Sequence, residues 1–138
     1  MITTYFKNMI MGNVFKSKTN PSLPNTYYLG LSSTAPTVSG TNATEPFISG
    51  NGYARVALDA NNLGAPSNGV VKNKAIVSFD ESLTDWFPAG TPATYYVVYD
   101  SATGGNLLMY NQLKAPRVIE SGTIVSIKVN GFSLQLTD

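Results

Sequence analysis

From Tyr27 onward, the sequence is a succession of short segments rich in β-branched and aromatic residues, separated by loops of Gly, Pro, Asn and Ser. Segments of this composition predict β-strands, and the loops predict turns. No helical segment alternates with them, so the strands are expected to be antiparallel and the fold class all-β. We expect an antiparallel β-sandwich, immunoglobulin-like or jelly-roll-like. The expected strands are residues 27–32, 53–58, 75–79, 95–100, 106–113, 125–129 and 132–136.

One short amino-terminal helix is expected before these strands, over residues 3–16. Thr3 or Thr4 supplies its N-cap, and prolines at positions 21 and 24 prevent its continuation. The chain of 138 residues suits one domain. Residues 1–24 then form a helical arm and linker, and residues 25–138 the β-sandwich. The apolar stripe of the helix comprises Phe6, Met9, Ile10 and Val14.

Two hairpins are expected among the later strands. Residues 95–100 and 106–113 pair across a turn in which Asp100 bonds backbone amides. Both faces of 95–100 carry apolar residues, so one face should meet the core and the other a neighbouring copy or the helix. Residues 125–129 and 132–136 alternate clearly, and a two-residue turn at Asn130-Gly131 would pair them. The alternative is one long strand with a bulge at that dipeptide.

The residue content argues against most catalytic and metal chemistry. The chain has no histidine and no cysteine, the side chains most used for proton transfer near neutral pH and for zinc. Asp80, Glu81 and Asp85 are clustered in the sequence but lack the ligand spacing of a calcium loop. We interpret them as a solvated turn, the alternative being the carboxylates of a polysaccharide-cleaving enzyme. No catalytic residue, cofactor or metal is expected.

Charge and hydropathy argue against nucleic acids and membranes as partners. The nine Lys and Arg are scattered and the net charge is +1, so there is no basic stripe for phosphates. No stretch approaches the roughly 18 continuous apolar residues of a membrane span. The amino terminus also lacks the pattern of a signal peptide. We expect a soluble product made in a cytoplasm, with no nucleic acid and no membrane as partner.

Several stretches, read together, resemble small virion structural proteins of tailed bacteriophages. They are YYLGLSSTAPTVSG, EPFISGNGYARVAL, YYVVYDSATGGNLLMYNQLKAPRVIESGTIVSI and FSLQLTD, within residues 27–138. Their most specific parts are residues 52–55 and 100–108, where order and spacing agree together. Members of this group are often labelled tail fibre proteins, and similar ones are thought to decorate the capsid. The resemblance implies a β-sandwich virion component without catalytic residues, and the helical start is expected to be particular to this sequence.

These observations favour a structural protein that acts by adhesion. We expect a capsid decoration protein on the surface of the virion, bound to the major capsid protein as a homotrimer, because oligomerisation supplies burial that a short chain lacks. The alternative is a tail or tail-fibre component that binds a host-surface receptor. The helix and the loop 37–52 are expected to reach the partner. The candidate partner-binding residues are Phe6, Met9, Ile10, Phe47, Tyr53, Arg55 and Trp86, although a core position is favoured for Trp86.

Overall fold

The computed structural model describes residues 1–16, 22–46 and 49–136. Within these ranges the chain forms one helix and eight short strands, and its strand pairs are antiparallel. No helix in the described ranges has the length and apolar character needed to cross a membrane. The elements are α1 (Thr4–Phe15), β1 (Tyr27–Ser32), β2 (Val56–Leu58), β3 (Val70–Lys72), β4 (Val77–Ser78), β5 (Ala93–Tyr99), β6 (Leu107–Arg117), β7 (Ser126–Ile127) and β8 (Ser133–Gln135).

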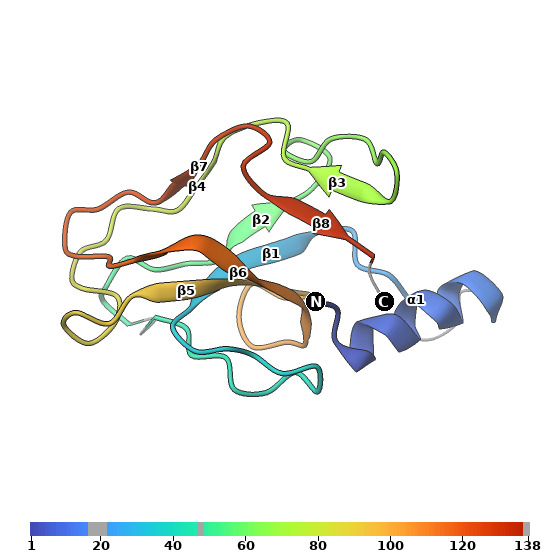
Figure 1. Cartoon of the computed structure of the whole chain (residues 1–138), viewed down its shortest axis with the longest axis horizontal. Coiled ribbons are helices and arrows are strands. Elements are labelled where there is room, and N and C mark those ends of the chain that lie inside the picture. Colours follow the sequence, from blue (N-terminus) through green and yellow to red (C-terminus); the bar gives the residue numbers. More distant parts are fainter. Residues whose placement is uncertain (17–21, 47–48, 137–138) are drawn as a thin grey trace.

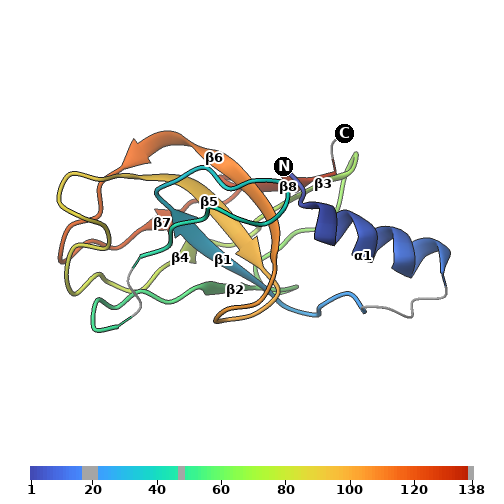
Figure 2. The ribbon, with the colours of Figure 1, turned by 90° about the horizontal axis from the view of Figure 1, so that it is seen from below.

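The largest unit is a four-stranded sheet with the order β2-β1-β5-β6. The pairs β3-β8 and β4-β7 form two separate ribbons, which lie on one side of that sheet (Figures 1 and 2). The main core fills the space between, where Leu29 and Val98 of the sheet join Val77 and Phe132 of the ribbon side. The all-β class with one short helix is therefore confirmed. The sandwich stays a prediction, because the second layer consists of short ribbons and loops.

The first strand and the first predicted hairpin lie where they are expected. β1 coincides with the predicted range, and β5 pairs with β6 as a hairpin. In the connecting turn, the Asp100 carboxylate accepts hydrogen bonds from the backbone N–H of Asn106 at 2.7 Å and from its side-chain amide at 3.0 Å. This confirms the structural role predicted for Asp100. β3, in contrast, is a strand that the sequence did not predict.

Both faces of β5 are covered, as its sequence requires. Val98 packs in the main core, whereas Val97 on the opposite face is fully buried in a smaller cluster with Leu107 and Tyr110. Ala43 packs against this smaller cluster. The loop that follows β1 therefore supplies part of the cover, which was expected from a neighbouring copy or the helix. At least this part of the loop 37–52 packs on the chain's own sheet.

The predicted carboxyl-terminal hairpin is wrong, and so is the single bulged strand. β7 pairs with β4, and β8 pairs with β3. Asn73, which is fully buried, explains the divergence. Its side-chain amide donates to the carbonyl of Lys128 at 2.8 Å, and its side-chain oxygen accepts from the N–H of Phe132 at 3.1 Å. The turn at Asn130-Gly131 is thus bound to Asn73, the residue that follows β3. The strands on either side of this turn, β7 and β8, therefore pair with different strands.

The helix is attached to the sheet from its first residues. Thr3 is its N-cap and accepts from the N–H of Phe6 at 3.3 Å, while its hydroxyl donates to the carbonyl of Leu107 at 2.7 Å. Ile2 forms a β-bridge with Met109 of β6. The helix then extends beyond the end of the sheet (Figure 1). Its amino-terminal half therefore packs against the domain, and its last turn projects from it.

Candidate functional site

The predicted helix residues lie against the core. Phe6 and Met9 are buried, and Ile10 is half-buried against them. The Phe6 ring packs edge-on against Tyr27 of β1, with 6.1 Å between ring centroids. In the single chain these side chains hold the helix on the sheet and present little surface to a partner. Their role in partner binding stays a prediction.

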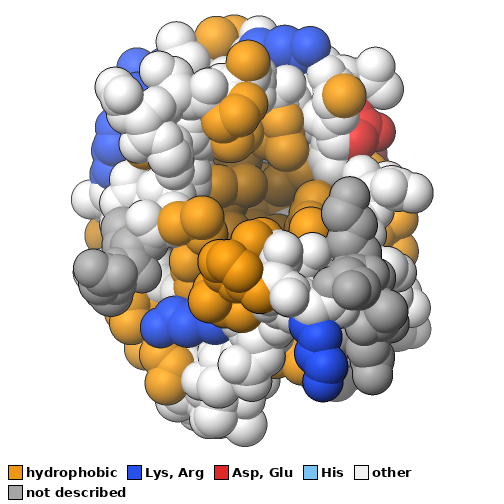
Figure 3. Space-filling model, turned by 90° about the vertical axis from the view of Figure 1, so that its right-hand side faces the viewer, with side chains coloured by type: hydrophobic (Ala, Val, Ile, Leu, Met, Phe, Trp, Pro, Cys, Tyr) orange, Lys and Arg blue, Asp and Glu red, His pale blue; other side chains and the backbone are white. Residues whose placement is uncertain are grey.

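The opposite side of the helix carries an exposed apolar surface, which we call the helix-end patch: Met11, Val14 and Phe15. Their exposed fractions are 56%, 62% and 77%. Figure 3 shows hydrophobic side chains gathered around a hollow at this end of the molecule. Val14 was predicted to share one apolar stripe with Phe6, Met9 and Ile10, but it is exposed while Phe6 and Met9 are buried, because the last turn of the helix lies beyond the sheet (Figure 1). The spacing of positions 11, 14 and 15 places them on one helix face, a signal from which this patch was predictable.

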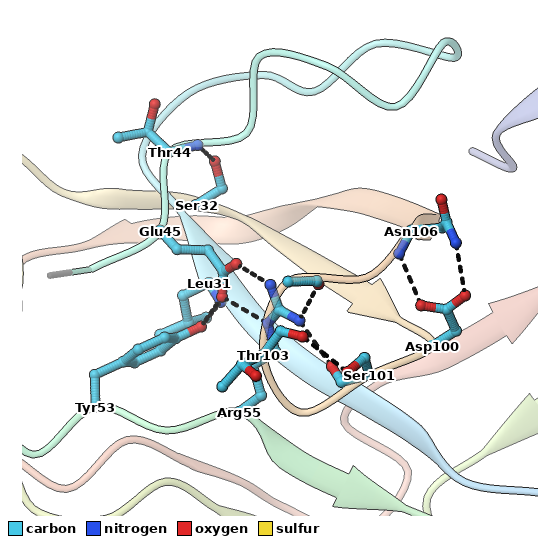
Figure 4. Close-up of polar contacts among 11 residues, drawn as sticks. Leu31, Ser32, Thr44, Glu45, Tyr53, Arg55, Asp100, Ser101, Thr103 and Asn106 are labelled. Atoms are coloured by element: carbon cyan, nitrogen blue, oxygen red, sulfur yellow. Dashed lines mark hydrogen bonds and ion pairs between the residues drawn. The ribbon is translucent and has the colours of Figure 1, made fainter. Parts of the chain in front are cut away.

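Arg55 is the centre of a polar network (Figure 4). Its Nη2 lies 2.6 Å from Oε1 of Glu45, and its Nε donates to Oε2 of Glu45 at 3.0 Å. Its Nη1 donates to the carbonyls of Ser101 and Gly104 at 2.7 and 2.8 Å. The guanidinium also lies 3.6 Å from the centre of the Tyr99 ring. Arg55 therefore joins the loop after β1 to the turn between β5 and β6.

Tyr53 completes this network from the core side. Its hydroxyl donates to Oε2 of Glu45 at 2.5 Å and accepts from the N–H of Leu31 at 3.2 Å. Burial raises the pKa of the Tyr53 phenol, and the charge of Glu45 raises it further. Burial alone would lower the pKa of Arg55, but the hydrogen bonds and charge of Glu45 outweigh it, so the pKa is raised. The sequence placed Tyr53 and Arg55 in one motif, and the structure gives both a role inside the fold.

Trp86 lies in the core, which confirms the interpretation favoured for it. Its side chain is 2% exposed, and its indole N–H donates to the carbonyl of Asn51 at 2.9 Å. The ring packs edge-on against Tyr53 and Phe79, with centroid distances of 5.1 and 6.0 Å. Phe47, another predicted partner-binding residue, lies outside the described residues.

The predicted acidic cluster lies in the loop after β4. Asp80, Glu81 and Asp85 are exposed, in agreement with a solvated turn. One oxygen of Asp85 accepts from the N–H of Ser121 at 3.1 Å. Over residues 1–16, 22–46 and 49–136, no group of three acidic side chains is arranged to hold a metal ion. The three acidic side chains are thus exposed groups of a hydrogen-bonded loop.

Comparison with known families decides the class of protein. A family model described as podophage GP4 fiber I protein gp80 matches residues 1–135. The chain belongs to this fibre I family. The resemblance to virion structural proteins of tailed phages is thus confirmed, and a fibre-type structural protein is a component of the virion. A search of curated proteins found no match.

Membership of the fibre I family also corrects one expectation. The helical start was expected to be particular to this sequence, but the family match begins at residue 1 and includes α1. The helix and its exposed end are therefore inside the region that matches the family. This makes the helix-end patch a candidate for a contact that fibre I proteins make.

Proposed function

We propose that this chain is a fibre subunit of a podophage-type virion, and that it acts by protein–protein adhesion and not by catalysis. The observation that carries the proposal is the family match over nearly the whole chain, residues 1–135. A fibre subunit must bind at least one other virion protein. The proposal therefore requires a surface that is left unpaired in the single chain.

The helix-end patch supports such an attachment. Phe15 is 77% exposed and Val14 62% exposed, although both are large apolar side chains. Burying one such side chain completely is worth about 1.5–3 kcal/mol, so their joint exposure has a cost that a partner removes. Contiguous exposed apolar side chains are typical of interaction sites. We propose that the last turn of α1 inserts into an apolar groove of a neighbouring virion protein.

Decoration of the capsid is a second candidate function, and it also requires adhesion to another virion protein. It predicts binding to the major capsid protein on the head surface, as a homotrimer. The family description favours the fibre, because it names a fibre protein. The receptor-binding alternative was expected to use the loop aromatics Tyr53 and Trp86, and both of these side chains are buried. We therefore propose an assembly role for the described surface and do not assign a receptor to it.

Labelling of purified virions tests the location. Particles are incubated with an antibody against this chain and a gold conjugate, and the labels are counted over heads and tails. The fibre proposal expects labels at the tail. Labels distributed over the head would favour decoration, and particles without labels whose protein content also lacks the chain would contradict both.

A pair of substitutions tests the attachment. Phe15→Glu places a charge in the helix-end patch, and Ile76→Glu is the matched control because Ile76 is 66% exposed elsewhere on the surface. Both variants should fold as the wild type does, since neither side chain is buried. Only Phe15→Glu is expected to lower incorporation into virions, by roughly tenfold or more, because a charge in a desolvated contact is costly. Equal incorporation of the two variants would exclude the helix end as the attachment.

A further inference from the structure

A second surface, separate from the helix-end patch, lies where the carboxyl end of β6 approaches β7. It is a cleft of about 350 Å³. Its apolar floor consists of side chains that are each at most 5% exposed: Leu31, Ala93, Ile119 and Val125. The irregular pairing between β5 and β6 explains why the cleft is open here. Tyr95 pairs with Gln112 and Ala93 pairs with Arg117, so the single residue Thr94 lies opposite β6 residues 113–116, and β6 leaves regular pairing.

The rim of this cleft is cationic. Lys114, Arg117 and Lys128 are exposed and line it, and no acidic residue is among the described residues that do so. The ion pair found among the described residues joins Arg55 to Glu45, so none of these three cations is neutralised by a described carboxylate. We call this surface the cationic cleft. Its chemistry fits an apolar side chain flanked by negative charges.

The same chain carries a segment with that chemistry. Residues 80–85 expose Asp80, Glu81 and Asp85, and between them Leu83 is 61% exposed although it is a large apolar side chain. We call these four residues the acidic ridge. Ser82 fixes the ridge from below: it is 1% exposed, and its hydroxyl donates to the carbonyl of Glu120 at 2.5 Å. The ridge is thus a preorganised projection, which reduces the entropy lost on binding.

We propose that the acidic ridge of one copy docks into the cationic cleft of a second copy of this chain. Leu83 covers the apolar floor, and the carboxylates of the ridge meet the ammonium and guanidinium groups of the rim. The two surfaces are different, so the contact either occurs twice in a two-fold dimer or repeats around a ring such as a trimer. This inference deepens the assembly role of the proposed function and rests on it, but it uses none of the residues of the helix-end patch.

Charge reversal with rescue tests the contact. Variant one carries Lys114→Glu, Arg117→Glu and Lys128→Glu, and variant two carries Asp80→Lys, Glu81→Lys and Asp85→Lys. Sedimentation analysis should show self-association of the wild type that weakens as salt rises, because the rim charges are exposed. Each variant alone should associate at least roughly tenfold more weakly. An equimolar mixture of the two should recover pairwise association between unlike variants, because the acidic ridge of variant one fits the cationic cleft of variant two and the reversed ridge of variant two fits the reversed cleft of variant one.

A matched control separates the specific contact from a change in net charge. Lys7→Glu, Lys72→Glu and Lys74→Glu alter the same number of exposed cations, none of which lines the cleft. This variant should associate nearly as the wild type does. A wild type that stays monomeric at high concentration would overturn the inference, as would variants that associate normally or a mixture without rescue. Binding of dodecanoate to a monomeric wild type would also overturn it, since the cleft would then take a small anionic amphiphile.

Cysteine cross-linking gives a second readout, because the chain has no cysteine of its own. Leu83→Cys on one copy and Ala115→Cys on another should form a disulfide between copies, since a disulfide requires Cα atoms within about 7 Å. The control replaces Ala115→Cys with Ala102→Cys, an exposed alanine in the β5–β6 turn. Equal cross-linking with both partners would contradict the contact. If the monomeric chain is nevertheless found on virions, this inference fails and the proposed function stands.

Discussion

Nη2 of Arg55 lies 2.6 Å from Oε1 of Glu45, and the two side chains are only 6% and 14% exposed. A buried pair of this kind adds little stability compared with an apolar pair, but removing one partner leaves an uncompensated charge in the interior. We therefore predict that Glu45→Gln lowers the free energy of unfolding by about 3 kcal/mol, the lower end of the cost of breaking a buried pair. Urea denaturation followed by tryptophan fluorescence measures this change.

The control for this prediction is Glu120→Gln, which makes the same chemical change at an exposed glutamate. Its effect should remain within about 0.5 kcal/mol, as for most surface substitutions. Equal stabilities of the two variants would mean that Glu45 is solvated in solution and that the network around Arg55 does not hold the two loops.

Trp86 and Phe15 provide a contrast between a buried and an exposed aromatic side chain. Trp86 is 2% exposed, whereas Phe15 is 77% exposed. Trp86→Ala should lower the free energy of unfolding by about 3–5 kcal/mol, the usual cost of removing a large core side chain. Phe15→Ala should change it by less than about 0.5 kcal/mol. Thermal unfolding of both variants checks this, and a large loss for Phe15→Ala would show that the helix end is packed within the chain.

Gly52 is required by close approach as well as by backbone conformation. Its φ is +80°, and a Cβ atom there would lie 2.6 Å from the carbonyl oxygen of Glu81. Gly50 has nearly the same φ, +79°, but a Cβ atom there meets no described atom within 4 Å. Gly52→Ala should therefore be less stable than Gly50→Ala by about 1–3 kcal/mol, the cost of inserting a methyl group into a packed site. Similar melting temperatures for the two variants would refute the steric argument.

Local signals were sufficient to predict part of this fold. β1, the β5–β6 hairpin and the Thr3 cap each depend on residues close in sequence. The carboxyl-terminal pairing depends instead on Asn73, which bonds to residues 128 and 132 across the fold. Strands of two or three residues carry too little pattern to define their partners. For that reason the alternation in residues 125–136 was visible while its pairing was not.

The candidate surfaces, like the strand pairings, could be predicted from the sequence only in part. The helix-end patch was predictable in part, because its residues share one helix face, but how far the helix extends beyond the sheet was unknown. The acidic ridge was visible as a cluster in the sequence, but the exposure of Leu83 was not. The cationic cleft combines Lys114, Arg117 and Lys128 with floor residues from distant segments. No short stretch of sequence contains that arrangement, so it emerges only from the packing of β6 near β7.

Buried and half-buried tyrosines predict how stability depends on alkaline pH. Burial raises the pKa of Tyr27, Tyr53, Tyr96 and Tyr99 above the ordinary value of 10.0. Between the unfolded and folded pKa values, the unfolded chain has lost these protons while the folded chain retains them, so the unfolded state binds fewer protons. Stability is then fully present below about pH 10 and falls as pH rises above it.

The Tyr53→Phe variant tests the largest contribution to this pH dependence. The free energy of unfolding of wild type and variant is measured from pH 8 to pH 11.5 by urea denaturation. The wild type should lose stability steeply above about pH 10, and the variant should lose it less steeply because one proton-retaining group is absent. Tyr5→Phe, at a more exposed position, is the control and should follow the wild-type slope. A variant slope equal to that of the wild type would mean that the Tyr53 phenol ionises in the folded protein as readily as in the unfolded chain, which its hydrogen bond to Glu45 should prevent.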